Sequence, residues 1–481
     1  MRRSGYASGG TRDRRGMRDL PLIQGPGALL RAAGCAALGL GVGACEPVAD
    51  LLGGGQGTPH ERYVESLRQA GLADRALGAA WIAAAGRALA EPLPVTLPFR
   101  ETGFFPADEA LARGYRIATR RGEEIVVSVE SEAGGPAVLF VDLFAVEPDE
   151  GPSFEQLQSI DSNITVIRHA TDKDGLLIVR LQPELLRPVR YTVTMQVEPT
   201  LAFPVDGHGT DAIRSGFGVD RDGGRRSHHG VDIFAPRGTA VLAAAEGRAE
   251  AGTNRLGGNV VWQRVPGLGA LYYAHLDSQA FTGERVVRPG DTVGFVGNTG
   301  NAVTTPPHLH FGIYARPGGP VDPFPFLYEP EAEPLEGLGS DVPLGGLART
   351  TARRAILRDA PDVGASRLDT LPAGTIMRVV AGAGNWRRID LPDGRTGFLR
   401  AAELTDAGSE TPLAATELTS PVTLRLRPDS GSMAIADLGP GTPIAVLGRF
   451  DDWQLVALGG DVRLPRSGTG SLPDRGWIPV E

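Results

Sequence analysis

Three short segments that carry histidine constrain this chain more than any other feature. Residues 227–233 read SHHGVDI, residues 272–276 read YYAHL and residues 307–311 read PHLHF. Six of the 8 histidines lie between His208 and His310, where an even spread would place about two. Histidine is the commonest metal ligand in proteins and the commonest general acid or base near neutral pH. Such a cluster, with the acidic Asp232 inside it, predicts a metal site that carries out chemistry.

The spacing of the first segment predicts a bend in the chain. His228 and Asp232 are four residues apart, which would suit one face of a helix, but Gly230 and the PRGT at residues 236–239 indicate a loop leading into a strand. In an extended strand the two residues would lie about 13 Å apart. That is too far for both to bind one ion at bond lengths of about 2 Å. The chain must therefore curl between them, and Gly230 is the residue that permits it.

The last segment predicts a strand with both histidines on one face. Residues 309–314 form a strand-like run, LHFGIY. The alternation of a strand places His308 and His310 on one face, and Leu309 and Phe311 on the other. Two neighbouring histidines, one bound to a metal and one free, would supply a Lewis acid and a base together.

At these residues the chain resembles the lysostaphin/LytM-type zinc endopeptidases, which cut the peptides of peptidoglycan. The shared pattern is a histidine four residues before an aspartate, then Tyr-Ala-His-Leu, then His-Leu-His-Phe, in this order. The flanking residues 215–218, 238–241, 287–291 and 296–300 match as well, so that the resemblance covers about residues 204–327. It implies an antiparallel β-sheet peptidase with one zinc ion per chain. It further implies that His228, Asp232 and His310 bind zinc, and that His275 and His308 are an unligated catalytic pair.

Composition narrows the class of protein. A chain of 481 residues with 41% hydrophobic residues is long enough for about three domains with packed cores. A net charge of -9 argues against a nucleic-acid partner, which would require a basic surface. Many glycines (66) and prolines (38) beside few aromatic residues predict many turns and short strands, so we expect a mainly β protein. We expect it to be a monomer.

The N-terminus has the pattern of an export signal. Several arginines precede an apolar run at residues 32–44, which is too short to span a bilayer but suits the core of a signal peptide. The run ends at Cys45, an arrangement that resembles the lipobox of bacterial lipoproteins. We therefore expect a cell-envelope protein whose residues 1–45 are a signal peptide and whose Cys45 carries a lipid that anchors it to a membrane. An ordinary signal peptide, a start at Met17 instead of Met1, and a twin-arginine signal at residues 14–15 remain alternatives.

Periodicity and composition divide the remaining chain. Cys35 and Cys45 are the only cysteines, so the mature protein has no internal disulfide and depends on its packed cores. We expect, in order, the following regions: a spacer and helix pair at 46–96, a β-sandwich accessory domain at 97–200, the peptidase domain at 201–328, an acidic linker at 329–346, and two SH3-like domains at 347–406 and 415–481.

The two C-terminal regions are predicted from an internal repeat. Residues 371–375 read LPAGT and residues 438–442 read LGPGT, and Trp386 and Trp453 are separated by the same offset of 67 residues. The repeat resembles bacterial SH3-like barrels, modules often attached to cell-wall enzymes. Whether these tryptophans bind wall material or lie in the cores of the barrels is left open by the sequence.

Two functions remain from these patterns. The first is a zinc endopeptidase that acts on peptidoglycan. The second is a non-catalytic relative that regulates cell-wall amidases through protein contact. The presence of all five residues of the set favours the enzyme. His208 and His229 lie outside the pattern, although His229 would replace His228 if the alignment were off by one, and Tyr273 is either a core residue or lines the site.

Overall fold

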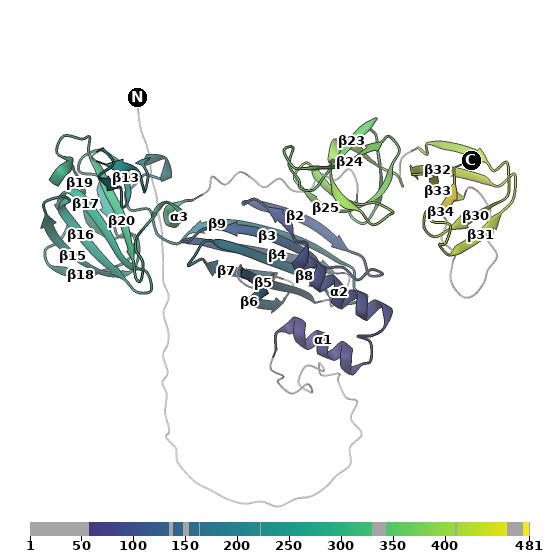
Figure 1. The fold of residues 1–481 in the computed structure, drawn as a ribbon, viewed down its shortest axis with the longest axis horizontal. Coiled ribbons are helices and arrows are strands. Elements are labelled where there is room, and N and C mark those ends of the chain that lie inside the picture. The colour runs from purple at the N-terminus through teal and green to yellow at the C-terminus, as the bar shows by residue number, and fades with distance from the viewer. Residues whose placement is uncertain are drawn as a thin grey trace, which may run out of the picture. The chain divides into compact units, whose positions relative to one another are not determined.

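Antiparallel strands make up most of the molecule (Figure 1), as the mainly β prediction requires. The structure is a computed structural model that describes residues 57–133, 138–147, 153–162, 164–221, 223–329, 343–408, 411–458 and 475–480. The predicted leader with Cys45 and most of the predicted linker lie outside these residues. Within them, no helix has the length and apolar character needed to cross a membrane.

Two helices come first, α1 (Pro59–Gln69) and α2 (Ala76–Ala90). Helix α1 begins at Thr58, whose hydroxyl accepts a hydrogen bond from the backbone of Glu61, while the Glu61 carboxylate accepts one from the backbone of Thr58. This reciprocal pair satisfies backbone N–H groups that the first helical turn cannot bond. The indole of Trp81 in α2 donates to the carbonyl of Pro183 at 2.8 Å and stacks on His60. His60 is thus a packing residue of the helix pair.

A β-sandwich follows. Its first sheet has the order β1-β3-β8-β5-β6, and β2, β9, β4 and β7 lie next to one another in the second. Alternate apolar residues of both sheets fill one core, which includes Ile117, Val127, Val141 and Val193. The strands are β1 (Leu93–Val95), β2 (Phe99–Phe105), β3 (Arg113–Thr119), β4 (Glu123–Ala133), β5 (Leu139–Glu147), β6 (Ser153–Asp161), β7 (Ile164–Ala170), β8 (Gly175–Pro183) and β9 (Val189–Pro199).

The C-terminal part holds two sets of strands. The first comprises β22 (Leu347–Thr350), β23 (Arg354–Arg358), β24 (Arg367–Pro372), β25 (Ile376–Ala383), β26 (Trp386–Asp390), β27 (Thr396–Arg400) and β28 (Leu404–Asp406). The second comprises β29 (Ala414–Glu417), β30 (Val422–Arg425), β31 (Ala434–Leu438), β32 (Pro443–Phe450), β33 (Trp453–Leu458) and β34 (Arg475–Pro479). Strand β25 also pairs with β2, so that the second sheet of the sandwich continues into the first set.

The repeated sequence forms the same turn in both sets. Gly374 and Gly441 have φ angles of 83° and 80°, a left-handed conformation that glycine adopts without steric cost. The following threonine donates its hydroxyl hydrogen to the carbonyl three residues earlier in each copy, at 2.8 Å for Thr375 and 2.7 Å for Thr442. Trp386 is half-buried, with the guanidinium of Arg400 lying 5.1 Å from its ring centre. Its indole is therefore partly covered by the barrel's own side chain.

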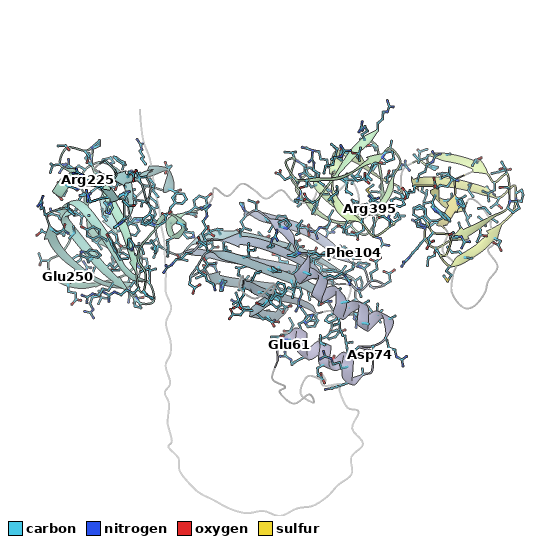
Figure 2. The ribbon with its side chains drawn as sticks, viewed as in Figure 1. Glu61, Asp74, Phe104, Arg225, Glu250 and Arg395 are labelled. Atoms are coloured by element: carbon cyan, nitrogen blue, oxygen red, sulfur yellow. The ribbon has the colours of Figure 1, made fainter. Side chains whose placement is uncertain are left out.

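The histidine-bearing segments lie on a separate ten-stranded sheet, on which Figure 2 labels Glu250. Its main order is β10-β13-β20-β17-β16-β15-β18. These strands are β10 (Ile213–Ser215), β13 (Val231–Phe234), β15 (Gly247–Asn254), β16 (Gly258–Val265), β17 (Gly269–Gln279), β18 (Glu284–Val287) and β20 (His308–Ala315). Strands β14 (Ala240–Leu242), β19 (Thr292–Val296) and β21 (Gly319–Val321) pair beside this path, a hairpin joins β11 (Asp220–Arg221) to β12 (Arg226–Ser227), and α3 (Phe324–Leu327) follows the sheet.

One face of this sheet packs on the core and the other carries the histidines. Leu309, Phe311 and Ile313 of β20 are completely buried in the core cluster, together with Leu271 and Tyr273 of β17. His308 and His310 alternate with these residues and therefore lie on the opposite face. The period-2 pattern read from the sequence thus accounts for the side of the sheet on which the site lies.

Candidate metal centre and flanking histidines

His228, Asp232 and His310 meet at one point. Asp232 on β13 is directly opposite His310 on β20, and His228 precedes β13 beyond a bend at Gly230. Three distances of 3.0 Å join the Nε2 atom of His228, the Oδ1 atom of Asp232 and the Nδ1 atom of His310. The curl expected between His228 and Asp232 is therefore present.

The reason for a glycine at position 230 differs from the expected one. Gly230 does not have the positive φ that would require glycine. Instead, a Cβ atom at this position would lie 2.4 Å from the carbonyl oxygen of Phe311 and 2.8 Å from the ring of His310. Glycine is needed because the chain passes close to β20, which is what brings His228 against His310.

The three converging atoms have too few hydrogens to satisfy one another. His228 Nδ1 lies 2.7 Å from the carbonyl oxygen of Gly216, and donation of its hydrogen there leaves a lone pair on Nε2. That lone pair faces the carboxylate of Asp232, which only accepts hydrogen bonds. A neutral His310 can supply one hydrogen at most. A cation at the centre of the triangle would remove this repulsion.

The size of the triangle fits zinc. Ligand atoms bound to a tetrahedral zinc ion at about 2.0–2.1 Å lie roughly 3.3 Å from one another, close to the three separations of 3.0 Å. These are the only three residues of the described chain that converge in this way among its histidine, cysteine and acidic side chains. Two imidazoles and a carboxylate form a ligand set typical of catalytic zinc sites, which keep a fourth position open.

Arg221 fixes which oxygen of Asp232 faces this centre. Its guanidinium donates to Asp232 Oδ2 at 2.5 Å and to the hydroxyl of Ser215 at 2.7 Å. Oδ1 is left for the two histidines. Burial raises the pKa of Asp232, but the imidazoles of His228 and His310 beside Oδ1 outweigh burial and hold the pKa well below its usual range. Asp232 is therefore an anion at neutral pH, as a metal ligand must be.

His275 and His308 stand beside the triangle. Their rings are 5.1 Å apart, and the ring of His275 is 5.9 Å from that of His310. The Nδ1 atom of His275 lies 2.9 Å from the carbonyl oxygen of Thr299, and that of His308 lies 2.9 Å from the carbonyl oxygen of Pro306. These bonds place hydrogen on Nδ1 and leave a lone pair on each Nε2. Both histidines are consequently arranged to accept a proton.

A β-bulge turns His275 toward the site. Strand β16 pairs Val261 with Tyr273 and Asn259 with Leu276, so that a single residue of β16 is opposite both Ala274 and His275. Regular alternation after the buried Tyr273 would point His275 into the core. The extra residue re-aims it, with a left-handed φ of 64°. Burial lowers the pKa of His275 to about 4, so its imidazole is neutral at pH 7.

Comparison with known proteins agrees with this geometry. Residues 226–323 match the sequence profile of peptidase family M23. This segment is an M23 peptidase domain. Residues 351–406 match the profile of the bacterial SH3 domain, where the sequence predicted the first barrel.

The relatives of the M23 domain include several named peptidases. The chain is 39% identical over 139 residues to the L-Ala--D-Glu endopeptidase of Bacillus subtilis, covering 26% of this chain and 42% of that protein. It is 43% identical over 101 residues to the DD-carboxypeptidase/endopeptidase Mpg of Neisseria meningitidis, covering 20% of this chain and 22% of that protein. Among solved structures, the catalytic domain of lysostaphin from Staphylococcus simulans is 34% identical, with 23% of this chain and 88% of that chain covered and a TM-score of 0.22. The match thus spans less than half the length of the Bacillus subtilis and Neisseria meningitidis relatives.

The remaining candidates of the M23 domain lie apart from the triangle. His229 is exposed and its ring is 6.4 Å from that of Phe217. His208 bonds to the carbonyl oxygen of Asp206. Tyr273, for which two roles were open, is a core residue whose hydroxyl donates to Gln263 and accepts from the backbone of Ala244. None of the three residues contributes an atom to the triangle.

Sequence reasoning missed two residues of the site. Arg221 lies on the β11–β12 hairpin, outside every histidine-bearing segment, and only its contact with Asp232 gives it a role. Tyr272 is the first residue of the YYAHL segment and had no predicted role, yet its ring lies 6.0 Å from that of His310 on the same face of the sheet. Strict alternation from Tyr273 would have identified Tyr272, whereas no sequence signal identifies Arg221.

Proposed function

We propose that the M23 domain is a zinc-dependent endopeptidase that hydrolyses a peptide bond of peptidoglycan. The observation that carries the proposal is the triangle of His228, Asp232 and His310 with the rings of His275 and His308 beside it. Zinc in this position would act as a Lewis acid that polarises the scissile carbonyl and lowers the pKa of water. Two relatives support the substrate class by their names, the L-Ala--D-Glu endopeptidase of Bacillus subtilis and the peptidoglycan DD-endopeptidase ShyC of Vibrio cholerae.

The flanking histidines would move the protons. The Nε2 lone pair of His275 or His308 would take the proton of the attacking water as a general base. The histidine that has accepted it then carries hydrogen on Nε2 and can donate it to the leaving amine. The other histidine lies about 5 Å away between ring centres. Once this second histidine carries a hydrogen on Nε2, it would donate a hydrogen bond to the oxyanion that develops on the substrate. The Nδ1 bonds to the carbonyls of Thr299 and Pro306 would hold both rings in place.

The experiment is digestion of purified peptidoglycan with residues 46–481, with and without a strong chelator, and mass spectrometry of the released fragments. We expect zinc-dependent release of fragments cut at a single type of peptide bond. Intact wall after incubation with protein that carries one zinc ion per chain would exclude the proposal. In that case regulation of amidases, the alternative function, would become the better description.

We also propose that the protein is exported and held in the cell envelope by a lipid on Cys45, with one or both SH3-like regions binding the wall and the chain acting as a monomer. Support comes from the apolar run before Cys45 and from the wall substrates named for the relatives. The variant Cys45→Ser should be released from membranes. A mature N-terminus at any other residue would contradict the lipid anchor.

A further inference from the structure

An aromatic wall leads away from His310 across the sheet. Tyr272 is one strand from His310, Trp262 is directly opposite Tyr272 on the next strand, and Tyr314 is four residues beyond His310. The ring centres of Trp262 and Tyr272 are 4.3 Å apart, and those of Trp262 and Tyr314 are 5.2 Å apart. Alternation puts all three rings on the face that carries His310. The metal centre therefore opens onto an aromatic surface.

This surface is exposed although its residues are large and apolar. Trp262 retains 37% of its accessible surface, whereas Tyr272 beneath it retains 9%. Aromatic residues make up only 6% of the chain, so three aromatic side chains in contact beside a metal centre are an unusual concentration. Exposed aromatic patches of this kind commonly mark binding surfaces.

A hollow with a volume of about 760 Å³ lies at the far end of the wall. Its lining includes Trp262, Tyr314, Arg248, Arg264, Arg316 and Glu250. Arg248 is 3.5 Å from Glu284, which also lines the hollow. Arg264 and Arg316 are exposed and form no ion pair with any residue described in the structure. Three arginines against two glutamates leave the hollow with an excess of one positive charge in a chain whose net charge is -9.

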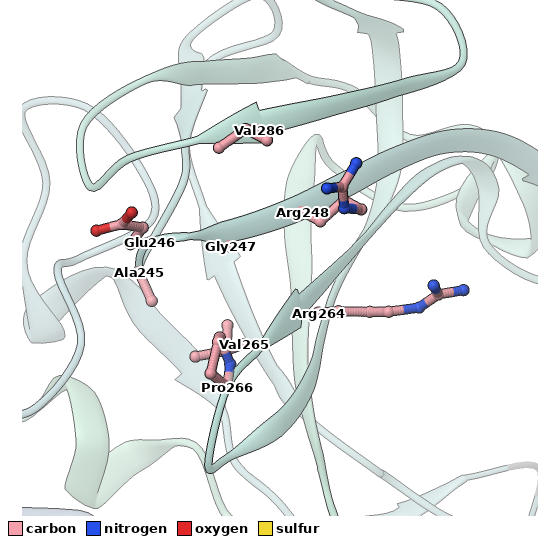
Figure 3. A pocket seen from close by; sticks show the side chains of 8 residues that line it. All are labelled: Ala245, Glu246, Gly247, Arg248, Arg264, Val265, Pro266 and Val286. Carbon is pink, nitrogen blue, oxygen red and sulfur yellow. The ribbon is translucent and has the colours of Figure 1, made fainter.

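Figure 3 shows Arg264 and Arg248 on neighbouring strands, where both also line a second hollow of about 790 Å³ beside Val286. Arg248 on β15 is directly opposite Arg264 on β16. Glu250, labelled in Figure 2, is opposite Trp262 on the same pair of strands. Of the two arginines in Figure 3, Arg264 is the one without an acidic partner among the described residues.

The distance from the metal centre to the arginines corresponds to a short peptide. Ala270 pairs with both Tyr314 and Arg264, so these two residues lie at one level of the sheet. That level is four residues along β20 from His310, which is about 13 Å. An extended peptide advances about 3.3 Å per residue. A strand laid parallel to β20 would therefore bring its fourth residue from the cleaved bond level with Arg264, and Arg316 lies two residues farther along the chain than Tyr314.

We propose that this face is a binding subsite for an acidic peptide strand. Trp262 and Tyr314 contact the backbone and apolar side chains of the strand, and Arg264 and Arg316 bind a carboxylate about four residues from the bond that is cut. Guanidinium groups suit this task because they donate two parallel hydrogen bonds to a carboxylate. The inference rests on the proposed function, since it defines which peptides the endopeptidase prefers.

The test uses a matched pair of peptides that span the cleaved bond and differ only in whether the carboxylate about four residues away is free or amidated. The zinc-loaded parent should cleave the free acid about tenfold more efficiently, through a lower KM, because one charge-assisted contact is worth about that factor. Arg264→Gln and Arg316→Gln should each reduce the preference while zinc content stays unchanged. Arg288→Gln, an exposed arginine outside the hollow, is the matched control and should retain it.

Two further variants keep the test decisive. Arg264→Lys keeps the charge but loses the two-pronged geometry, so part of the preference should remain. Trp262→Ala should raise KM for both peptides alike. A parent that cleaves both peptides equally overturns the subsite and leaves the proposed function standing, whereas failure to cleave either peptide or whole wall with zinc bound speaks against the proposed function itself. An effect of the arginine variants confined to substrates that carry glycan also overturns the inference.

Discussion

Two buried aspartates in this molecule have opposite surroundings. Asp142 in the sandwich is completely buried, and Arg180 donates to its Oδ2 from two nitrogens, at 3.0 and 2.7 Å. Gln156 and Ser159 donate to its Oδ1. Asp232 in the M23 domain is also paired with an arginine through Oδ2, but its Oδ1 faces two imidazoles that together hold at most one hydrogen for it.

The difference separates a structural ion pair from a binding site. The carboxylate of Asp142 has a hydrogen-bond donor on both oxygens, which is the condition for burying a charge without a large penalty. The carboxylate of Asp232 meets that condition on one oxygen only. On its other side, a bound cation would satisfy the carboxylate in place of the missing donor. A buried aspartate paired with an arginine is therefore not by itself evidence of a functional site. The informative feature is the carboxylate oxygen that lacks its hydrogen-bond donors.

The largest expected effect comes from neutralising each aspartate in turn. Asp232→Asn should lose zinc and lower peptidase turnover about a thousandfold or more, because the bound cation provides several kcal/mol of stabilisation to the reaction. Asp142→Asn should keep zinc and turnover while making the sandwich easier to unfold. Elemental analysis and digestion of purified peptidoglycan measure both. Normal zinc in Asp232→Asn would mean that the two aspartates do not differ in the way described.

The second prediction concerns the histidines that do not face Asp232 directly. His275→Ala and His308→Ala should each keep near-parental zinc and lower turnover about a hundredfold or more, the scale of losing a general base or an oxyanion donor. The double variant should cost less than the product of the two single effects, because the pair acts as a unit. His310→Ala, in contrast, should lose zinc as well. Parental cleavage by either single variant would reject the proton transfers proposed here.

The third prediction uses pH. In the metal-free protein, burial depresses the pKa of His275 to about 4 from its ordinary value of 6.5, so between these values the unfolded chain binds more protons than the folded one. The stability contributed by the neutral ring is present above pH 6.5 and is lost as pH falls toward 4, by about 2 kcal/mol at pH 5. Hydrogen exchange of peptides from β17 should report faster opening at pH 5 than at pH 7, after correction for intrinsic rates. Peptides from β5 around Asp142 are the internal reference, and His275→Gln should remove the excess.

The smallest effect concerns the arginine of each pair. Arg221→Gln should weaken zinc binding about tenfold, measured by competition with a chelator, since residues that orient a metal ligand typically contribute ten- to a hundredfold. The guanidinium also repels a dication, but Arg221 is 35% exposed and solvent screens that term. Arg180→Gln should leave zinc affinity unchanged. Tighter zinc binding in Arg221→Gln would show that repulsion outweighs orientation.

The sequence predicted some features of this site and missed others. The two-residue spacing of His308 and His310 was enough to predict the face of the strand. The resemblance of the three segments to the lysostaphin/LytM-type endopeptidases named the five residues that the structure brings together. The same pattern did not reveal Arg221, because its partner is eleven residues away across a hairpin and no periodicity links them. It also attributed Gly230 to backbone freedom, whereas the close passage of β20 is a property of the assembled sheet. The leader and Cys45 lie outside the described residues, so the predicted lipid anchor stays a prediction.

The same difference between local and long-range signals applies to the fold as a whole. Strands between residues 97 and 200 could be predicted because alternation and turn residues are local signals, and β2 to β9 lie in this range. The pairing of β2 with β25, at Thr102–Gly382 and Gly103–Ala381, was not readable. It joins residues almost 280 positions apart through backbone hydrogen bonds, to which side-chain patterns contribute little. Local chemistry predicted the elements, and long-range backbone contacts decided their neighbours.

The bulge at His275 has a consequence for how this chemistry can be acquired or transferred. No substitution in a regular strand can place a histidine at this point, because regular alternation after Tyr273 would turn that side chain into the core. A lineage, or an engineer copying the site onto a plain antiparallel sheet, must first insert one residue opposite Val260 and only then choose its side chain. Deleting that residue would reverse the change in one step and would leave the later positions of β17 on their present faces, because Leu276 is already opposite Asn259. The number of residues in a strand is therefore as heritable a part of this site as the identity of its ligands.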